Sequence, residues 1–166
     1  MKCFRQVTAL VVGLLAVATQ SVWGSALDRS VRVCVDERVK LGSRVGKAFR
    51  TELNVLSQAA ARFVDCSQPT SIRISIRSHA PARYETALGL AYAAGDRVLP
   101  VIELYVVNIL RTLGRQIGSD SFGRALARVA FHELEHYNRQ QRHHDTGGLF
   151  APSLTGTHLL TDVRRR

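Results

Sequence analysis

Residues 132–136 read His-Glu-Leu-Glu-His, inside a stretch whose apolar residues recur at helical spacing. Two histidines four positions apart lie one turn apart on the same face of a helix, so both imidazoles can reach one metal ion. The glutamate between them, Glu133, then lies beside that ion and can accept a proton from water. The motif therefore predicts a zinc site of hydrolytic type, with His132 and His136 as ligands and Glu133 as general base.

The motif helix, which is expected to begin near residues 119–121, has two distinct faces. Glu133 falls near the middle of a broad apolar face, and the two histidines lie at its border. The apolar face is formed by Phe122, Leu126, Val129, Ala130 and Tyr137, and a narrow polar sector by Arg124, Arg128, Glu135, Arg139 and Arg142. This placement is typical of a helix at the floor of a cleft, and Glu135 is expected to pair with Arg139.

Two ligands on one helix require a third from elsewhere and a coordination position open to water. No glutamate follows Glu135, which argues against peptidases whose third ligand is a glutamate on a later helix. The metzincin pattern would place a third histidine at position 142, where this chain has arginine. The candidates that remain are His143, His144, Asp145, His158 and Asp162.

The start of the chain predicts export. Lys2 and Arg5 precede an apolar stretch over residues 7–17, and small residues follow at 24–26. This is the pattern of a signal peptide over residues 1–26, which leaves 27–166 as one domain of a secreted or periplasmic protein. A membrane anchor is the alternative, but the stretch is short against the about 20 residues of a spanning helix. We therefore expect no stable membrane span after export.

Two cysteines remain after removal of the signal peptide, Cys34 and Cys66. In an oxidising compartment such a pair predicts one disulfide, which would contribute roughly 3–4 kcal/mol by the loop-entropy argument. Two buried free thiols are the alternative. A metal-binding role is disfavoured because the cysteines lack C-x-x-C spacing.

Residues 27–166 are strongly basic. Without Lys2 and Arg5 the chain holds 21 basic against 13 acidic residues, a net charge of +8. Such a surface favours acidic peptides, anionic polysaccharide or anionic membrane faces. The arginines are scattered, however, and no basic groove with interleaved aromatic residues is evident, so nucleic-acid binding is not expected. Peptide or protein substrates are the predicted partners.

Hydrophobic periodicity predicts an α/β (α+β) fold: a small mixed sheet packed on one long helix, with the motif helix below a cleft. Ser43 is a candidate N-cap for the long helix. Pro100 confines its strand to an edge or a bulge, which makes that strand the candidate edge for capturing an extended substrate. The expected elements are strands at 31–35, 72–76, 87–92 and 98–105, and helices at 43–64, at 106–116 and over the motif.

The segment 132–150 resembles a family of small exported bacterial proteins with a zincin-like domain, mostly predicted metallopeptidases. The pattern of that family is H-E-x-x-H, seven residues, then H-S-x-x-G-(I/L)-M. His132, Glu133 and His136 match the first part, and Gly148-Leu149 match the glycine step. The chain departs from the pattern at Asp145, where serine is usual, at Phe150, where methionine is usual, and at Glu135, where glycine is common.

The resemblance implies that residues 27–166 form a zincin-like domain and that His144 is the third zinc ligand. It implies a zinc metallopeptidase in which Glu133 is the catalytic base. The alternative is an exported zinc-binding protein without catalysis, and a third interpretation has exposed or pH-sensitive histidines and no metal. The residue that stabilises the oxyanion is left open among Tyr84, Tyr92, Tyr105 and Arg142.

Overall fold

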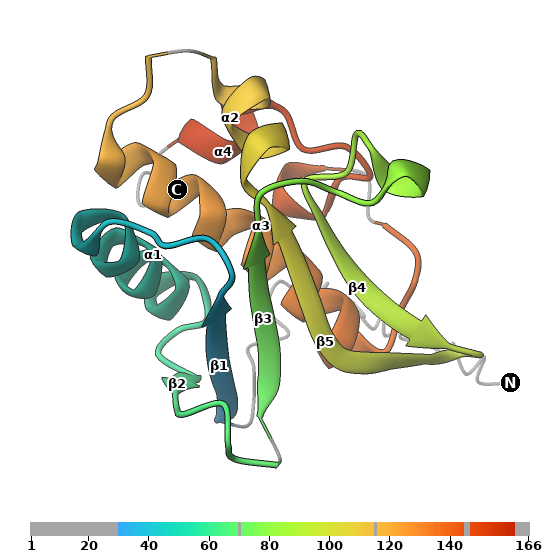
Figure 1. Ribbon diagram of the computed structural model, residues 1–166. Helices are drawn as coiled ribbons and strands as arrows, with labels where there is room; N and C mark the ends of the chain where they lie inside the picture. Colours follow the sequence, from blue (N-terminus) through green and yellow to red (C-terminus); the bar gives the residue numbers. More distant parts are fainter. Residues whose placement is uncertain (1–29, 70, 115, 145–146, 162–166) are drawn as a thin grey trace, which may run out of the picture.

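The computed structural model describes residues 30–69, 71–114, 116–144 and 147–161, so the predicted signal peptide lies outside the described residues. A five-stranded sheet with the strand order β2-β1-β3-β5-β4 runs through the domain (Figure 1). The first four strands in that order are parallel, and β4 is antiparallel to β5. The strands are β1 (Val31–Glu37), β2 (Ala61–Phe63), β3 (Ile72–Arg77), β4 (Gly89–Ala94) and β5 (Arg97–Tyr105).

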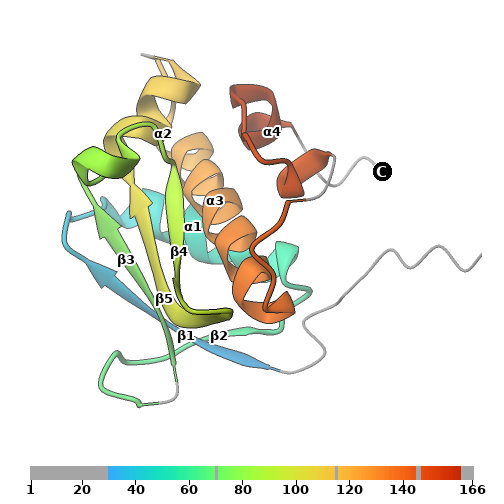
Figure 2. The same ribbon diagram turned by 90° about the vertical axis from the view of Figure 1, so that its right-hand side faces the viewer.

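Helices cover one face of this sheet, as Figure 2 shows in side view. They are α1 (Ser43–Leu56), α2 (Val106–Leu113), α3 (Ser119–Arg139) and α4 (Gly156–Leu160), with 3-10 turns η1 (Ala82–Tyr84) and η2 (Gly148–Phe150). Helices α1 and α3 pack against each other, α3 also packs against β4 and β5, and the ring of Phe49 in α1 contacts that of Phe63 in β2. The predicted mixed sheet with helices is therefore confirmed.

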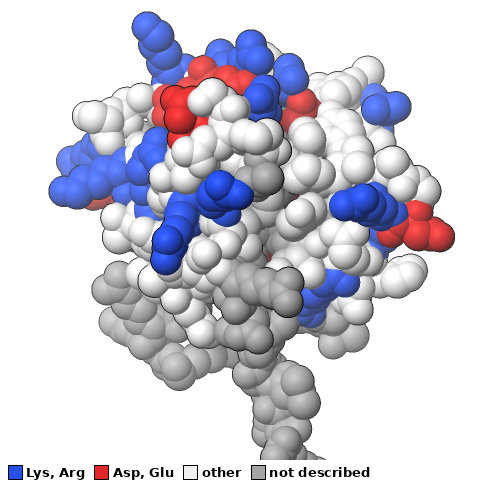
Figure 3. All heavy atoms as spheres, turned by 90° about the horizontal axis from the view of Figure 1, so that it is seen from below, with Lys and Arg blue, Asp and Glu red and all other residues white. Residues whose placement is uncertain are grey.

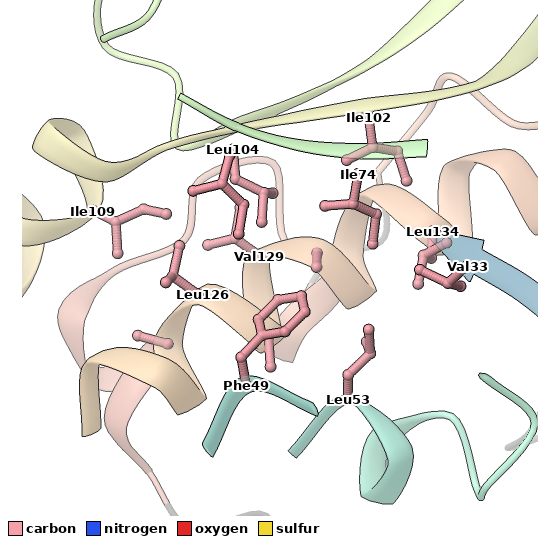
Figure 4. Packing of buried hydrophobic residues seen from close by; sticks show 14 of the residues in the cluster. Val33, Phe49, Leu53, Ile74, Ile102, Leu104, Ile109, Leu126, Val129 and Leu134 are labelled. Carbon is pink, nitrogen blue, oxygen red and sulfur yellow. The ribbon is translucent and has the colours of Figure 1, made fainter. Parts of the chain in front are cut away.

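Alternating isoleucines join the sheet to these two helices. Ile74 of β3 pairs with Val35 of β1 and Ile102 of β5, so the three side chains form one row across the sheet. Phe49 and Leu53 of α1 enter the same buried cluster, together with apolar residues of α3 (Figure 4). The core thus lies between the sheet and the α1–α3 layer.

The helix predicted over residues 43–64 ends at Leu56, so the C-terminal third of that prediction is wrong. Gln58 and Ala59 have positive φ angles of 53° and 63°, and they reverse the chain. Residues 61–63 then pair with β1 as the parallel strand β2. Apolar spacing over so few residues suits a helix or a strand, and the pairing with β1 decides between them. Ser43 is the first helical residue, and the N-cap is Gly42.

The predicted antiparallel pair is present as β4 and β5, but the edge assignment is wrong. β5 pairs with both β3 and β4, which leaves β4 at the edge. Pro100 is accommodated at an irregularity, because Ala91 opposes Ile102 whereas Ala93 opposes Val98. The pairing of β5 with β3 begins only at Val101, so the missing N–H of Pro100 breaks no bond of that ladder.

A C-terminal strap, which we define as residues 147–161, was not predicted. It contains η2 and α4 and runs back along α3 (Figure 2). Beneath it lies Arg128, only 2% exposed, which donates to Glu52 of α1 and to the carbonyls of His158 and Thr161. Part of the polar sector of α3 is therefore buried, and it connects α3 to α1 and to the strap.

The disulfide between Cys34 and Cys66 is present, as predicted, with its Cα atoms 5.0 Å apart. It links β1 to the segment that follows β2. No helix among the described residues combines the length and apolar character that a bilayer span requires.

The contact between α1 and α3 yields a prediction at Gly123. A Cβ at this position would lie 2.5 Å from the carbonyl oxygen of Val45, so we expect Gly123→Ala to destabilise the fold by about 1–3 kcal/mol. Gly46, also helical, has open space around it, and Gly46→Ala should instead stabilise by about 0.5–1 kcal/mol. Urea unfolding of the oxidised protein measures both changes, and equal effects would contradict the close packing.

Candidate metal centre and cleft

The end of α3 turns the chain so that the next residues return over the motif. Helix α3 stops at Arg139, and Gln140 adopts a left-handed conformation with φ 51°. The Gln140 side chain mimics a backbone unit: its Oε1 accepts from the Val98 N–H at 3.1 Å, and its Nε2 donates to the Val98 carbonyl at 3.3 Å. This contact joins the end of α3 to β5 and brings residues 141–144 beside the last helical turn.

Three imidazoles meet at this end of the helix. The Nε2 atom of His136 lies 3.2 Å from Nε2 of His132 and 3.2 Å from Nε2 of His144. The ligand atoms of the three residues all lie within 4.8 Å of one another. The structure thus brings together the motif histidines and His144.

Backbone carbonyls orient two of these rings. Nδ1 of His132 is 2.6 Å from the Leu149 carbonyl oxygen, and Nδ1 of His136 is 2.8 Å from that of Gln141. A carbonyl oxygen can only accept, so each Nδ1 donates, and each Nε2 of a neutral ring carries a lone pair. Carbonyl acceptors of this kind are the usual outer partners of metal-ligating histidines.

The resulting arrangement fits a zinc ion. Lone pairs that face each other at 3.2 Å repel unless a cation lies between them. Ligand nitrogens about 2.0–2.1 Å from a tetrahedral zinc ion would be about 3.3 Å apart, close to the separation found here. Burial lowers the pKa of the His132 imidazole to about 4, which keeps the ring neutral, as a ligand must be.

Glu133 lies between the helix and the edge strand, 7% exposed. The Ala91 N–H of β4 hydrogen-bonds to its carboxylate, and burial raises the pKa of this carboxyl to about 7. A Cβ added at Gly89 would lie 3.0 Å from its Oε1, so the absence of a side chain at Gly89 lets β4 approach. The sequence pattern alone assigned Gly89 no role in the site.

A cleft of about 790 Å³ extends from this centre along β4. The edge strand forms one wall, and the strap residues Pro152, Ser153 and Leu154 lie on another side. The motif residues His132, Glu133 and His136 line the cleft together with His144. This volume is within the range of about 300–1,000 Å³ common for ligand sites.

The other predicted candidates are distributed around the site. His143 is exposed and lies outside the three-histidine cluster. Thr155 caps α4, and the Nδ1 atom of His158 accepts from the Thr155 N–H in the same capping box. Asp145 and Asp162 lie outside the described residues. Two of the four oxyanion candidates, Tyr92 and Tyr105, donate their hydroxyls to Glu103. The other two, Tyr84 and Arg142, line the cleft and make no hydrogen bond to Glu103.

Phe150 anchors the strap beneath the histidines. Its ring lies 6.0 Å from that of Phe131, and the Arg139 guanidinium carbon is 4.7 Å from its centroid. Arg139 is held in turn by Glu135 at 2.9 Å, the helix pair predicted from the sequence. These contacts fix the residue next to Leu149, whose carbonyl orients His132. The sequence motif gave no indication of this carbonyl.

Comparison of the chain with protein-family models, curated proteins and solved structures found no match.

The burial of Glu133 predicts a pH-dependent gain of stability in Glu133→Gln. Because its pKa in the folded state lies above the ordinary 4.5, the folded protein binds more protons than the unfolded one between pH 4.5 and 7. Its stability therefore falls as the pH rises through this window. In metal-free protein Glu133→Gln should remove that cost, with a gain of at most about 3 kcal/mol above pH 7 and none below pH 4.5. Urea unfolding at pH 4 and pH 8 tests this, and equal gains would contradict it.

Proposed function

We propose that the protein is an exported zinc-dependent metallopeptidase. His132, His136 and His144 would hold the zinc ion, and Glu133 would act as general base. The observation that carries this proposal is the convergence of three Nε2 atoms beside a buried carboxylate at the floor of a cleft. The resemblance of segment 132–150 to exported zincin-like proteins points to the same activity.

The number of ligands favours catalysis over a purely structural zinc site. Structural zinc sites are closed by four protein ligands, whereas catalytic sites keep a position for water or substrate. Among the described residues, the cluster contains three imidazoles, and neither His143 nor His158 belongs to it. The alternative of a non-catalytic zinc-binding protein would need a fourth ligand.

The edge strand offers a place for an extended peptide. β4 is paired on one side only, so a substrate could add to its outer edge as a further strand. Residues 89–91 of β4 lie directly against Glu133. A peptide on this edge would therefore carry a carbonyl past the general base.

The residues of the site have separate tasks in hydrolysis. A bound zinc ion would supply Lewis acidity, which activates water and polarises the substrate carbonyl. Glu133 takes the proton from the attacking water and later gives it to the leaving amine, and its pKa of about 7 suits both transfers. The Ala91 N–H orients its carboxylate. Tyr84 remains the candidate for binding the oxyanion, because the Arg142 guanidinium donates to Gly95, in the turn beyond the end of β4.

Export rests on the N-terminal pattern and on the disulfide. Disulfides form and persist in oxidising compartments, and the bond between Cys34 and Cys66 fits such a location. The protein would thus act on peptides or proteins outside the cytoplasm.

Metal analysis tests the ligand set. The purified protein should bind about one zinc ion per chain, because three neutral imidazoles supply a catalytic ligand set. His144→Ala should lose this zinc, and His143→Ala, which alters the exposed neighbour, should retain it. Full zinc occupancy in His144→Ala would show that His144 is not a ligand.

Replacement of the base tests the chemistry. Glu133→Gln keeps the size of the side chain but removes the proton acceptor, so hydrolysis of an unstructured protein should fall by about 10²–10⁴ with zinc retained. Glu85→Gln, at an exposed carboxylate in the loop before β4, is the matched control and should keep full activity. Equal activity of wild type and Glu133→Gln would disprove the mechanism, and zinc binding without any cleavage would favour the non-catalytic alternative.

A further inference from the structure

In the lining of the cleft, basic side chains outnumber acidic ones. Its charged residues, among those that the structure describes, are Arg83, Arg142 and Glu133, beside the three histidines. Two arginines against one carboxylate give the lining a net positive charge even with Glu133 ionised, and a divalent cation would increase this potential.

Arg142 lies at one end of the edge strand. Its guanidinium donates to the carbonyl of Gly95, the residue that follows β4 in the hairpin turn, at 3.3 Å. The Arg142 side chain is exposed and enters none of the ion pairs formed by the described residues. It can therefore receive a carboxylate from a bound molecule.

Arg83 lies at the other end. It belongs to η1 in the loop that leads into β4, and Figure 1 shows this loop and the β4–β5 turn at opposite ends of the strand. Its guanidinium carbon is 4.9 Å from the ring centroid of Tyr84, so the aromatic face restricts its orientation. Arg83, too, enters no ion pair within the described part of the chain.

We propose that the cleft selects peptides that carry acidic side chains on both sides of the cleaved bond, with Arg83 and Arg142 as the specificity-determining residues. This inference rests on the proposed peptidase function and names its substrate class. The reacting carbonyl would pass Glu133 near Ala91, and Gly95 is four residues further along the chain. At about 3.3 Å per residue, the acidic group bound by Arg142 would lie about three to four residues from the cleaved bond.

The basic character of the whole protein could in principle produce a weak preference of the same sign. Lysine and arginine form several separate groups, with acidic residues among them, on the face shown in Figure 3. Arg62 supplies a control for this general effect. It is exposed on β2, at the opposite edge of the sheet from β4, so Arg62→Glu changes the net charge equally without altering the cleft.

Binding to zinc-loaded Glu133→Gln, measured by fluorescence anisotropy, tests the inference. The probes share one central sequence and carry aspartate, asparagine or lysine on both sides, or aspartate on one side only. At low salt the peptide with two aspartates should bind at least about tenfold more tightly than the lysine peptide, and added salt should reduce the ratio. Arg142→Glu and Arg83→Glu, in the same background, should each abolish the preference at one end, and at different ends.

Two results would overturn the inference: equal affinity for all peptides, or a loss of preference in Arg62→Glu as large as in the cleft variants. Cleavage of the same peptides by the wild-type protein tests the underlying function separately. Selective binding without cleavage would contradict the peptidase proposal and support the acidic-ligand inference. Cleavage without any charge preference would support the peptidase and overturn the inference.

Discussion

The position of α3 is the constraint on which the site depends. Near its start, Gly123 lets the helix touch the backbone of α1, and at its end Gln140 joins it to Val98 of β5. Between these two attachments, Gly89 allows the edge strand to lie against the carboxylate of Glu133. A helix fixed at both ends holds its side chains to the small tolerances that catalytic groups require. The geometry of the motif is thus a consequence of contacts outside it.

Two buried charged residues of α3 illustrate different uses of the same low-dielectric environment. Arg128 is compensated by Glu52 and by two strap carbonyls, and this arrangement stabilises one relative position of α1, α3 and the strap. Glu133 makes no ion pair with any described residue, and its burial raises its pKa. The uncompensated group is the one to which we assign chemistry, in agreement with the general concentration of perturbed pKa values at active sites.

The sequence predicted those features that depend on local pattern. The helical spacing of the motif, the strands near 31–35 and 72–76 and the hairpin around Gly95 needed only periodicity and turn residues. The disulfide was predicted from two cysteines that follow a predicted signal peptide. The predictions failed where contacts between segments far apart in the sequence determine the structure. The strand at Ala61 forms because β1 is beside it, β5 is interior because β3 pairs with it, and the strap has no periodicity of its own. Likewise, the carbonyl of Leu149 that orients His132 is a backbone group, and every residue type has one, so the sequence cannot predict this contact.

The strap also sets the order in which the centre can be assembled during synthesis. The three histidines and Glu133 all precede residue 147, whereas the acceptor for His132 and the Phe150 anchor follow it. A nascent chain that has emerged only as far as His144 therefore contains every side chain of the site but lacks the carbonyl that orients its first imidazole. The orientation of His132 is therefore completed only after residues 147–161 have been translated and have packed along α3.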